Sequence, residues 1–222
     1  MKREINSDAA VSAYIEGSAF KLTCAIYGPK SKPKTYDQKD PATVFCKLNE
    51  TYLSPSSAKP CDAQIAIEAE NAERDRRQVL CTKMSSILEN TILCVAYPNC
   101  EFVAKFDVVE TDGNTGSLLH QLCLAASAAL VSTHQESIKT RTTLLSCFAC
   151  AKQGTVYVDS ECTEERLKDS ELECFVCYDP TYDEIVMLET KSGKERNPEE
   201  VSDIVDLCID GCKAFHELFS KI

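Results

Sequence analysis

The segment from residue 102 to residue 131 reads FVAKFDVVETDGNTGSLLHQLCLAASAALV, and it decides which fold the sequence predicts. The residues from Phe102 to Val109 are mostly apolar and rich in Val and Phe, as in a strand. A turn with two glycines runs from Thr111 to Ser117, and the almost wholly apolar segment from Leu118 to Val131 is typical of a buried helix. Backbone N–H groups at the start of such a helix favour an anion. The sequence therefore predicts a strand, an anion-binding turn and a central helix.

The bulk composition narrows the class of protein. The 222 residues are 44% hydrophobic and 27% charged, which fits one large globular domain over residues 1–222. Because 35 acidic residues outweigh 24 basic ones, a protein that binds nucleic acid by its overall charge is excluded, and any such contact needs a local basic patch. We find no apolar run of about 18 residues and no apolar core of a secretory signal. We therefore expect a soluble intracellular protein without a membrane partner.

The rest of the chain predicts a mixed α/β fold. Strands are expected at 12–16, 20–27, 42–48, 142–151, 155–158, 172–178 and 185–190. Gly28 and Pro29 are expected to end the second strand, and a basic polar loop follows them. Residues 63–68 could be a strand or the entry to the helix predicted at 71–91. The last helix is expected to begin at Pro198, with Asn197 as its N-cap.

Fourteen cysteines are scattered through apolar segments, where a free thiol behaves as a small buried hydrophobic group. Two Cys-x-x-Cys pairs, Cys147/Cys150 and Cys174/Cys177, would suggest zinc if taken alone. Their flanks are apolar and strand-like, and residues i and i+3 of a strand point to opposite faces. We therefore expect core cysteines and no metal site, with a zinc protein as the alternative.

Four segments occur in an order that resembles the ribonuclease PH family. They are Cys24-Ala-Ile-Tyr-Gly-Pro29, Asp107-Val-Val-Glu-Thr-Asp-Gly113, Leu122-Cys-Leu-Ala-Ala-Ser-Ala-Ala-Leu130 and Val156-Tyr-Val-Asp159. The resemblance covers nearly the whole chain, and it is strongest to the ribonuclease PH-like ring subunits of the eukaryotic exosome. The helix start Gly116-Ser-Leu-Leu119 resembles the forty-six type of subunit, which lacks long extensions.

This resemblance implies a ribonuclease PH-like α/β fold (ribosomal protein S5 domain 2-like), with two similar βαβ-type halves and mixed sheets packed around central helices. It also implies a hexameric ring with other ribonuclease PH-like subunits around an RNA channel. The nucleus, nucleolus and cytoplasm are the expected locations. The implied function is support of 3′–5′ RNA processing and degradation, including processing of ribosomal RNA.

Active members of the family cleave RNA with inorganic phosphate, which an arginine in a Gly-Gly-Thr-Arg turn grips in bidentate fashion. Here the turn retains Gly113, Asn114, Thr115, Gly116 and Ser117, but Leu118 or Leu119 stands at the arginine's position. Losing such a contact costs about 2 to 4 kcal/mol of transition-state stabilisation. We therefore expect a non-catalytic subunit with no resident cofactor.

Asp159 and Glu165 match the family's two acidic positions and are candidate remnants of its catalytic pair. The alternative is a solvated acidic loop that also includes Glu161 and Glu164. If the acids still act, the chain could be a stand-alone homodimer that binds RNA or DNA. Such a dimer would have weak Mg²⁺-dependent nuclease activity or would assist a separate nuclease.

Two basic groups are candidate nucleic-acid contacts: Lys30, Lys32 and Lys34, and Arg74, Arg76, Arg77 and Lys83. The arginines are expected at the start of a helix, where the dipole disfavours them, so Glu73 or Asp75 could instead pair with them. The three histidines, His120, His134 and His216, form no recognisable triad with a Ser or Cys. His120 could touch an anion at the turn or serve packing.

Overall fold

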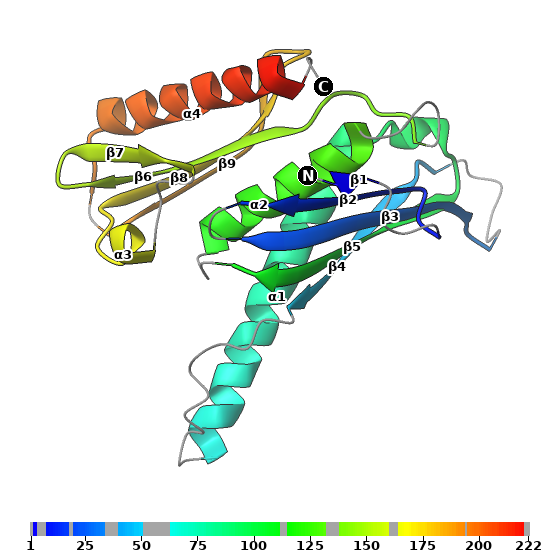
Figure 1. Cartoon of the computed structure of the whole chain (residues 1–222), viewed down its shortest axis with the longest axis horizontal. Helices are drawn as coiled ribbons and strands as arrows, with labels where there is room; N and C mark the ends of the chain where they lie inside the picture. The colour runs from blue at the N-terminus through cyan, green and yellow to red at the C-terminus, as the bar shows by residue number, and fades with distance from the viewer. Residues whose placement is uncertain are drawn as a thin grey trace.

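The computed structural model describes residues 2–3, 8–17, 20–33, 40–50, 63–111, 115–131, 138–159, 164–193 and 195–219. These residues form two β-sheets with helices between them and on one outer face (Figure 1). No helix among them is both long and apolar enough to cross a bilayer. The predicted mixed α/β fold is confirmed.

The first sheet has the strand order β1-β2-β3-β5-β4. Its strands are β1 (Lys2–Arg3), β2 (Val11–Glu16), β3 (Lys21–Ser31), β4 (Thr43–Glu50) and β5 (Cys100–Glu110). The chain crosses from β4 to β5 through α1 (Ala63–Thr91) and the short η1 (Cys94–Ala96), and these two strands pair in parallel. The other pairs in this sheet are antiparallel.

The second sheet has the order β7-β6-β8-β9, and all its pairs are antiparallel. Its strands are β6 (Leu145–Lys152), β7 (Thr155–Val158), β8 (Leu172–Asp179) and β9 (Glu184–Ser192). The short α3 (Glu164–Leu167) lies between β7 and β8, and α4 (Pro198–Phe219) closes the chain. Asn197 Oδ1 accepts a hydrogen bond from the Glu199 N–H (3.2 Å), as predicted for the N-cap.

Four layers follow one another: α4, the second sheet, the central helices and the first sheet (Figure 1). The helix α2 (Thr115–Val131) contacts β2 and β3 on one side and β6 and β8 on the other. Its small residues Ala125, Ala126, Ala128 and Ala129 are all buried, so both sheets approach it closely. The apolar composition of this segment reflects burial on all sides.

The cysteines divide between the two faces of the second sheet. Cys147 and Cys174 lie in a hydrophobic cluster with Cys208 and Cys212 of α4. Cys150 and Cys177 lie in the larger core between the sheets, as the i, i+3 geometry predicts. All six are buried and free, and no group of three or more Cys, His, Asp or Glu suited to a metal occurs in the described part of the chain. Gly211 lets α4 approach β6, because a Cβ there would lie 2.9 Å from Cys147 Sγ.

Two expectations about the elements were wrong. β3 does not end at Gly28, because a bulge between Tyr27 and Lys30 leaves Gly28 and Pro29 unpaired and pairing resumes at Lys30. Gly28 has φ +125°, and a Cβ there would lie 2.8 Å from the Glu101 carbonyl oxygen, so this bulge requires glycine. α1 begins at Ala63, so of the two alternatives for residues 63–68 the helix entry is confirmed. The halves also differ, because the described second half lacks a βαβ crossover.

Candidate functional site

The predicted anion turn leads into α2, and its described polar side chains are engaged within the protein. Residues 112–114, including Gly113 and Asn114, lie outside the described residues, as do the side chains of Thr115 and Gly116. Ser117 is buried, and its Oγ accepts a hydrogen bond from Gln121 Nε2 (3.0 Å). Thr111 Oγ1 lies 3.3 Å from Gln121 Oε1. These contacts tie the end of β5 to the first turns of α2.

The two residues at the expected arginine position face the interior. Leu118 is 0% exposed and Leu119 is 1% exposed, and both belong to the core between the sheets. A guanidinium at either place would be buried among apolar groups, where an unpaired charge is strongly disfavoured. The local packing of α2 therefore fits leucine here, and these side chains cannot grip an anion.

Asp159, the first predicted catalytic acid, is brought to the second turn of α2. It follows β7 directly and has φ +47°, a left-handed conformation that aspartate tolerates better than most residues. Its Oδ1 accepts a hydrogen bond from the Phe148 N–H (2.8 Å) and lies 3.4 Å from His120 Nε2. Among the described residues, neither Lys nor Arg forms an ion pair with this carboxylate.

His120 joins Asp159 to Ser146, a grouping that the sequence analysis did not find. The imidazole Nδ1 lies 3.0 Å from Ser146 Oγ, while Nε2 faces Asp159. Ser, His and Asp in this order resemble a hydrolase triad, but Ser146 is 1% exposed and His120 is 5% exposed. Desolvation lowers the pKa of His120, against the opposing effect of Asp159. Because substrate has no access to the hydroxyl, the three residues form a buried polar link between α2, β6 and the end of β7.

The second predicted acid, Glu165, lies in α3, and its side chain is outside the described residues. Leu167 of the same helix is buried in the core, which fixes α3 beside β6. The described residues alone do not assemble a Mg²⁺ site.

The arginines of α1 are held in an ion-pair network with Glu50 at the end of β4. Arg76 Nη2 lies 2.6 Å from Glu50 Oε1 and 2.6 Å from Glu73 Oε1. Arg77 Nε lies 2.9 Å from Glu50 Oε2. The Glu50 carboxylate is 3% exposed, and the hydrogen bond from Arg76 lowers the pKa of Glu73 to about 2. The predicted pairing with Glu73 is confirmed, so both arginines are largely neutralised.

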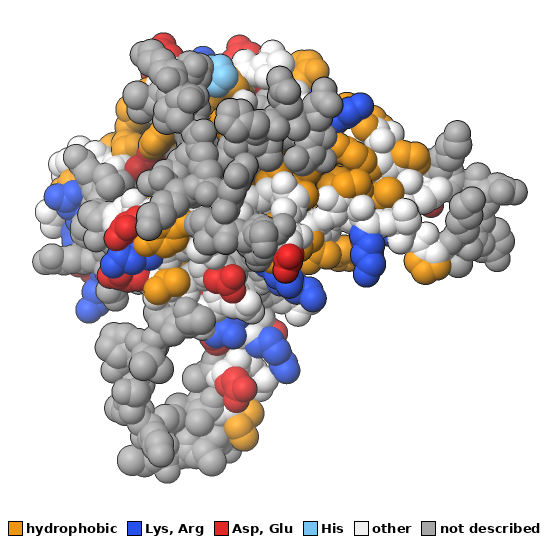
Figure 2. Space-filling view, turned by 45° about the vertical axis from the view of Figure 1, so that its right-hand side comes forward, with side chains coloured by type: hydrophobic (Ala, Val, Ile, Leu, Met, Phe, Trp, Pro, Cys, Tyr) orange, Lys and Arg blue, Asp and Glu red, His pale blue; other side chains and the backbone are white. Residues whose placement is uncertain are grey.

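The prediction that these arginines lie at the start of the helix is wrong, because they lie well inside α1. On the face shown in Figure 2, the coloured Lys/Arg and Asp/Glu side chains of the projecting part lie side by side. Arg74 is exposed and its described contact is a hydrogen bond to Asn71 Oδ1 (3.1 Å). It is the best-placed of the three arginines for an external ligand.

The remaining basic candidates are separated from one another. Lys83 Nζ lies 2.6 Å from Glu189 Oε2 and so links α1 to β9. Lys30 is exposed near the end of β3, Lys32 is half-buried, and Lys34 lies outside the described residues. Lys30 of β3 lies in backbone register with Glu101 of β5, which in turn lies beside Thr43 at the start of β4. The arginines instead contact Glu50 at the end of β4. Seven residue steps of about 3.3 Å place these two groups roughly 23 Å apart, so they do not form one patch.

Two sheets around a central helix, with Asp159 at the end of β7 beside that helix, form the arrangement of a ribonuclease PH-like protein. A family model described as "3′ exoribonuclease family, domain 1" matches residues 1–136, which is more than half of the chain. The chain belongs to this family.

Relatives and solved structures agree with this assignment. The chain is 24% identical to exosome complex component Rrp41 of Cenarchaeum symbiosum over 217 residues, covering 97% of this chain and 81% of the relative. It is 26% identical to Rrp41 of Methanopyrus kandleri over 208 residues, covering 93% and 78%.

In structure it is similar to rice (Oryza sativa) Rrp46, with a TM-score of 0.72, 16% identity and coverage of 99% of this chain and 91% of that one. It is also similar to a chain of the Archaeoglobus fulgidus exosome with RNA bound to the active site, with a TM-score of 0.71, 16% identity and coverage of 98% and 86%. At these identities the structures show the fold alone. The resemblance to the family is confirmed, and the forty-six subtype stays a prediction.

Proposed function

We propose that this chain is a non-catalytic ribonuclease PH-like subunit of an exosome core ring, which supports 3′–5′ RNA processing and degradation and contributes to RNA binding. Its partners would be other ribonuclease PH-like subunits, as in the Rrp41 relatives named for the exosome complex. The similarity extends over 97% of the chain, so it concerns the whole fold and not a single motif.

The main support for a non-catalytic subunit is the burial of Leu118 and Leu119 at the position expected for the arginine. Phosphorolysis requires a cation that holds phosphate beside the scissile bond. In the described part of the chain, Asp159 faces His120 and a backbone N–H, and the ion pairs of the basic candidates Arg76, Arg77 and Lys83 are with glutamates. The two buried leucines and these pairings, all among the described residues, support a subunit that does not carry out phosphorolysis.

The test is assembly followed by an activity assay. The chain is co-expressed with the other ribonuclease PH-like subunits of its own genome, and the mass of the purified complex is measured by light scattering. We expect a discrete ring that includes this chain. A chain that remains alone with every such subunit would contradict the proposal.

Activity is then measured as release of nucleoside diphosphates from labelled RNA in the presence of phosphate. The isolated chain is expected to release none. Phosphate-dependent release that Asp159→Asn abolishes would show that the site is catalytic.

The alternative is a homodimer that acts on RNA or DNA by itself, and the retained Asp159 beside α2 favours it. It predicts a dimer mass for the isolated chain. It also predicts Mg²⁺-dependent cleavage of labelled RNA or DNA that phosphate does not stimulate. Either result would separate it from the ring proposal.

A further inference from the structure

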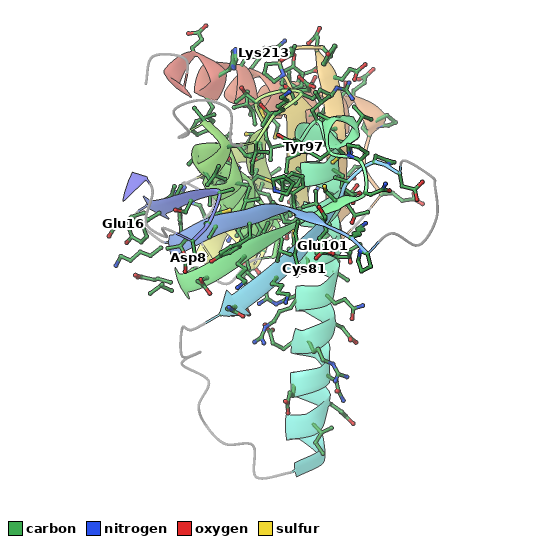
Figure 3. All side chains as sticks on the ribbon, turned by 90° about the vertical axis from the view of Figure 1, so that its right-hand side faces the viewer. Asp8, Glu16, Cys81, Tyr97, Glu101 and Lys213 are labelled. Carbon is green, nitrogen blue, oxygen red and sulfur yellow. The ribbon has the colours of Figure 1, made fainter. Side chains whose placement is uncertain are left out.

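The face of the first sheet that points away from α2 carries an unusual set of side chains. Along β5 the inward residues from Phe102 to Val108 are buried, and along β4 they are buried or half-buried, whereas the outward residues of both strands are half-buried or exposed. In the described part of the chain no helix contacts this outer face, and Figure 3 shows its strands running between the ends marked by Glu16 and Glu101. Its exposed side chains, such as Phe45 and Lys105, are those that a ligand or partner could contact.

Two aromatic rings lie in one row across this face. The register places Val103 of β5 opposite both Tyr27 of β3 and Phe45 of β4. Phe45 is 51% exposed, which is high for a phenylalanine on a strand. Exposed aromatic side chains on an open sheet are the platforms on which single-stranded bases stack in several RNA-binding folds.

Lysines occupy the rows on both sides of the rings. Lys47 and Lys105 are directly opposite each other, two residues further along their strands than Phe45 and Val103. Lys30 lies in the row on the other side, in register with Glu101. Side chains two residues apart on a strand lie about 6.6 Å apart, so positive charges border the aromatic row on two sides.

The facing lysines are an independent sign of an anionic ligand. Neighbouring strands are about 4.8 Å apart, and like charges directly opposite each other destabilise a sheet. The ion pairs of described lysines involve Lys21, Lys83, Lys152, Lys191 and Lys213, and none involves Lys30, Lys47 or Lys105. Lys105 Nζ instead lies over the Tyr27 ring, 4.7 Å from its centroid. In a chain of net charge −11, three lysines around two rings that form no ion pair with another described residue mark a local exception.

We propose that Tyr27, Lys30, Phe45, Lys47 and Lys105 form a binding platform for single-stranded RNA, which we call the sheet platform. The rings of Tyr27 and Phe45 stack on bases, and the lysines contact phosphates. Two acidic residues border the platform, Glu101 on one side and Asp107 on the other. Asp107 accepts a hydrogen bond from Asn49 (2.8 Å). Because their negative charges repel phosphates, they limit the platform to a few nucleotides. The proposal deepens the RNA-binding part of the proposed function but does not depend on ring assembly, because all five residues belong to one chain.

The experiment measures fluorescence anisotropy of a fluorescein-labelled ten-nucleotide single-stranded RNA with the isolated full-length chain. The test variants are Phe45→Ala and the double variant Lys47→Gln/Lys105→Gln. Two matched controls are available. The control for Phe45→Ala is Val109→Ala, because Val109 of β5 is also 51% exposed. The control for the lysine variant is Lys191→Gln, because Lys191 is exposed on β9 of the second sheet. Circular dichroism checks that each variant is folded, which the exposure of all these side chains leads us to expect.

We expect Phe45→Ala to weaken binding about tenfold, as for loss of one stacked base. The double variant should weaken binding at low salt by at least as much. It should also lower the slope of log affinity against log salt by about 1.4, because each phosphate contact on a single strand contributes about 0.7. The two controls should bind within about twofold of the wild type. A base-paired hairpin should bind more weakly than the single strand, because its bases are not free to stack.

Three results would overturn the inference. They are no RNA binding by the wild-type chain, equal binding by the test variants and the wild type, or loss in the controls equal to loss in the test variants. Assembly with partner subunits is measured separately on the same variants. If the double variant loses assembly while RNA binding is unchanged, the sheet platform is a protein interface and the inference is wrong. If assembly fails for the wild type but the RNA results hold, the ring proposal fails alone.

Discussion

His120 Nε2 lies 3.4 Å from Asp159 Oδ1, and through this contact α2 is joined to the residue that follows β7. The sequence predicts Asp159 as a remnant of a catalytic pair. In the structure its carboxylate also accepts a hydrogen bond from the Phe148 N–H, so it connects three elements of the fold. Asp159 therefore has a structural role, which can be tested separately from the predicted catalytic one.

Replacing Asp159 separates the two roles. Asn retains an acceptor for the Phe148 N–H and tolerates the left-handed conformation, whereas Ala does neither. We expect Asp159→Ala to lower the free energy of urea unfolding by about 1 to 3 kcal/mol, and Asp159→Asn by clearly less. The ring containing Asp159→Asn should degrade RNA at the wild-type rate. A large loss of that activity with unchanged stability would contradict the structural role.

The buried imidazole predicts a dependence of stability on pH. Because desolvation lowers the pKa of His120 below its usual 6.5, the unfolded chain binds more protons just below that pH. The His120 contribution is therefore complete above pH 6.5 and is lost as the pH falls toward the folded-state pKa, by at most about 1.4 kcal/mol per pH unit. Urea unfolding between pH 5 and pH 8 measures it. His120→Gln should flatten this slope, while His216→Gln, on the exposed side of α4, serves as the matched control.

The arginines of α1 should differ in their effects. Arg76 contacts the buried Glu50, so Arg76→Ala leaves that carboxylate with one partner fewer and should cost about 1 to 3 kcal/mol of unfolding free energy. Arg74 is exposed, so Arg74→Ala should stay within about 0.5 kcal/mol. If RNA reaches α1, Arg74→Ala should weaken binding more than Arg76→Ala does. Equal destabilisation by the two changes would contradict the network.

Thiol reactivity tests both the burial of the cysteines and the absence of zinc. Eight of the described cysteines are buried, so at most six of the fourteen thiols should react with a disulfide reagent in the native protein. Burial also raises the pKa of the half-buried Cys46 to about 12, which keeps it a poor nucleophile. All fourteen should react in urea. Treatment with a zinc chelator should leave the native count unchanged, whereas an increase by four would indicate a metal site.

The periodicity of the sequence predicted most elements because burial and alternation coincide there. The segment from Leu118 to Val131, the two hairpins and the Asn197 cap lie where the pattern placed them. The predicted strand end at Gly28 was wrong, because a bulge can carry a strand past glycine and proline. The start of α1 was left open between two alternatives, because an exposed helix has no apolar stripe to mark where it begins.

The candidate site was less predictable, because its contacts join residues far apart in the chain. His120 lies on α2, Ser146 on β6 and Asp159 directly after β7. These three residues meet only because α2 packs against β6 in the folded protein. The same holds for Glu50, which no local pattern connects to Arg76 and Arg77. The outward lysines Lys47 and Lys105 were visible as polar positions in strands, but only the parallel register aligns them with each other and with Phe45.

The exposed first part of α1 has a consequence for how the molecule comes apart. From residue 63 to residue 79 none of the described side chains is buried, and Leu80 is the first that is. These seventeen residues make about 26 Å of helix that depends on the Glu50 network, since an isolated helix of this length is marginal in water. Backbone amides before Arg76 should therefore exchange with deuterium far faster than those from Leu80 onward. A protease should cut there first and leave both sheets intact.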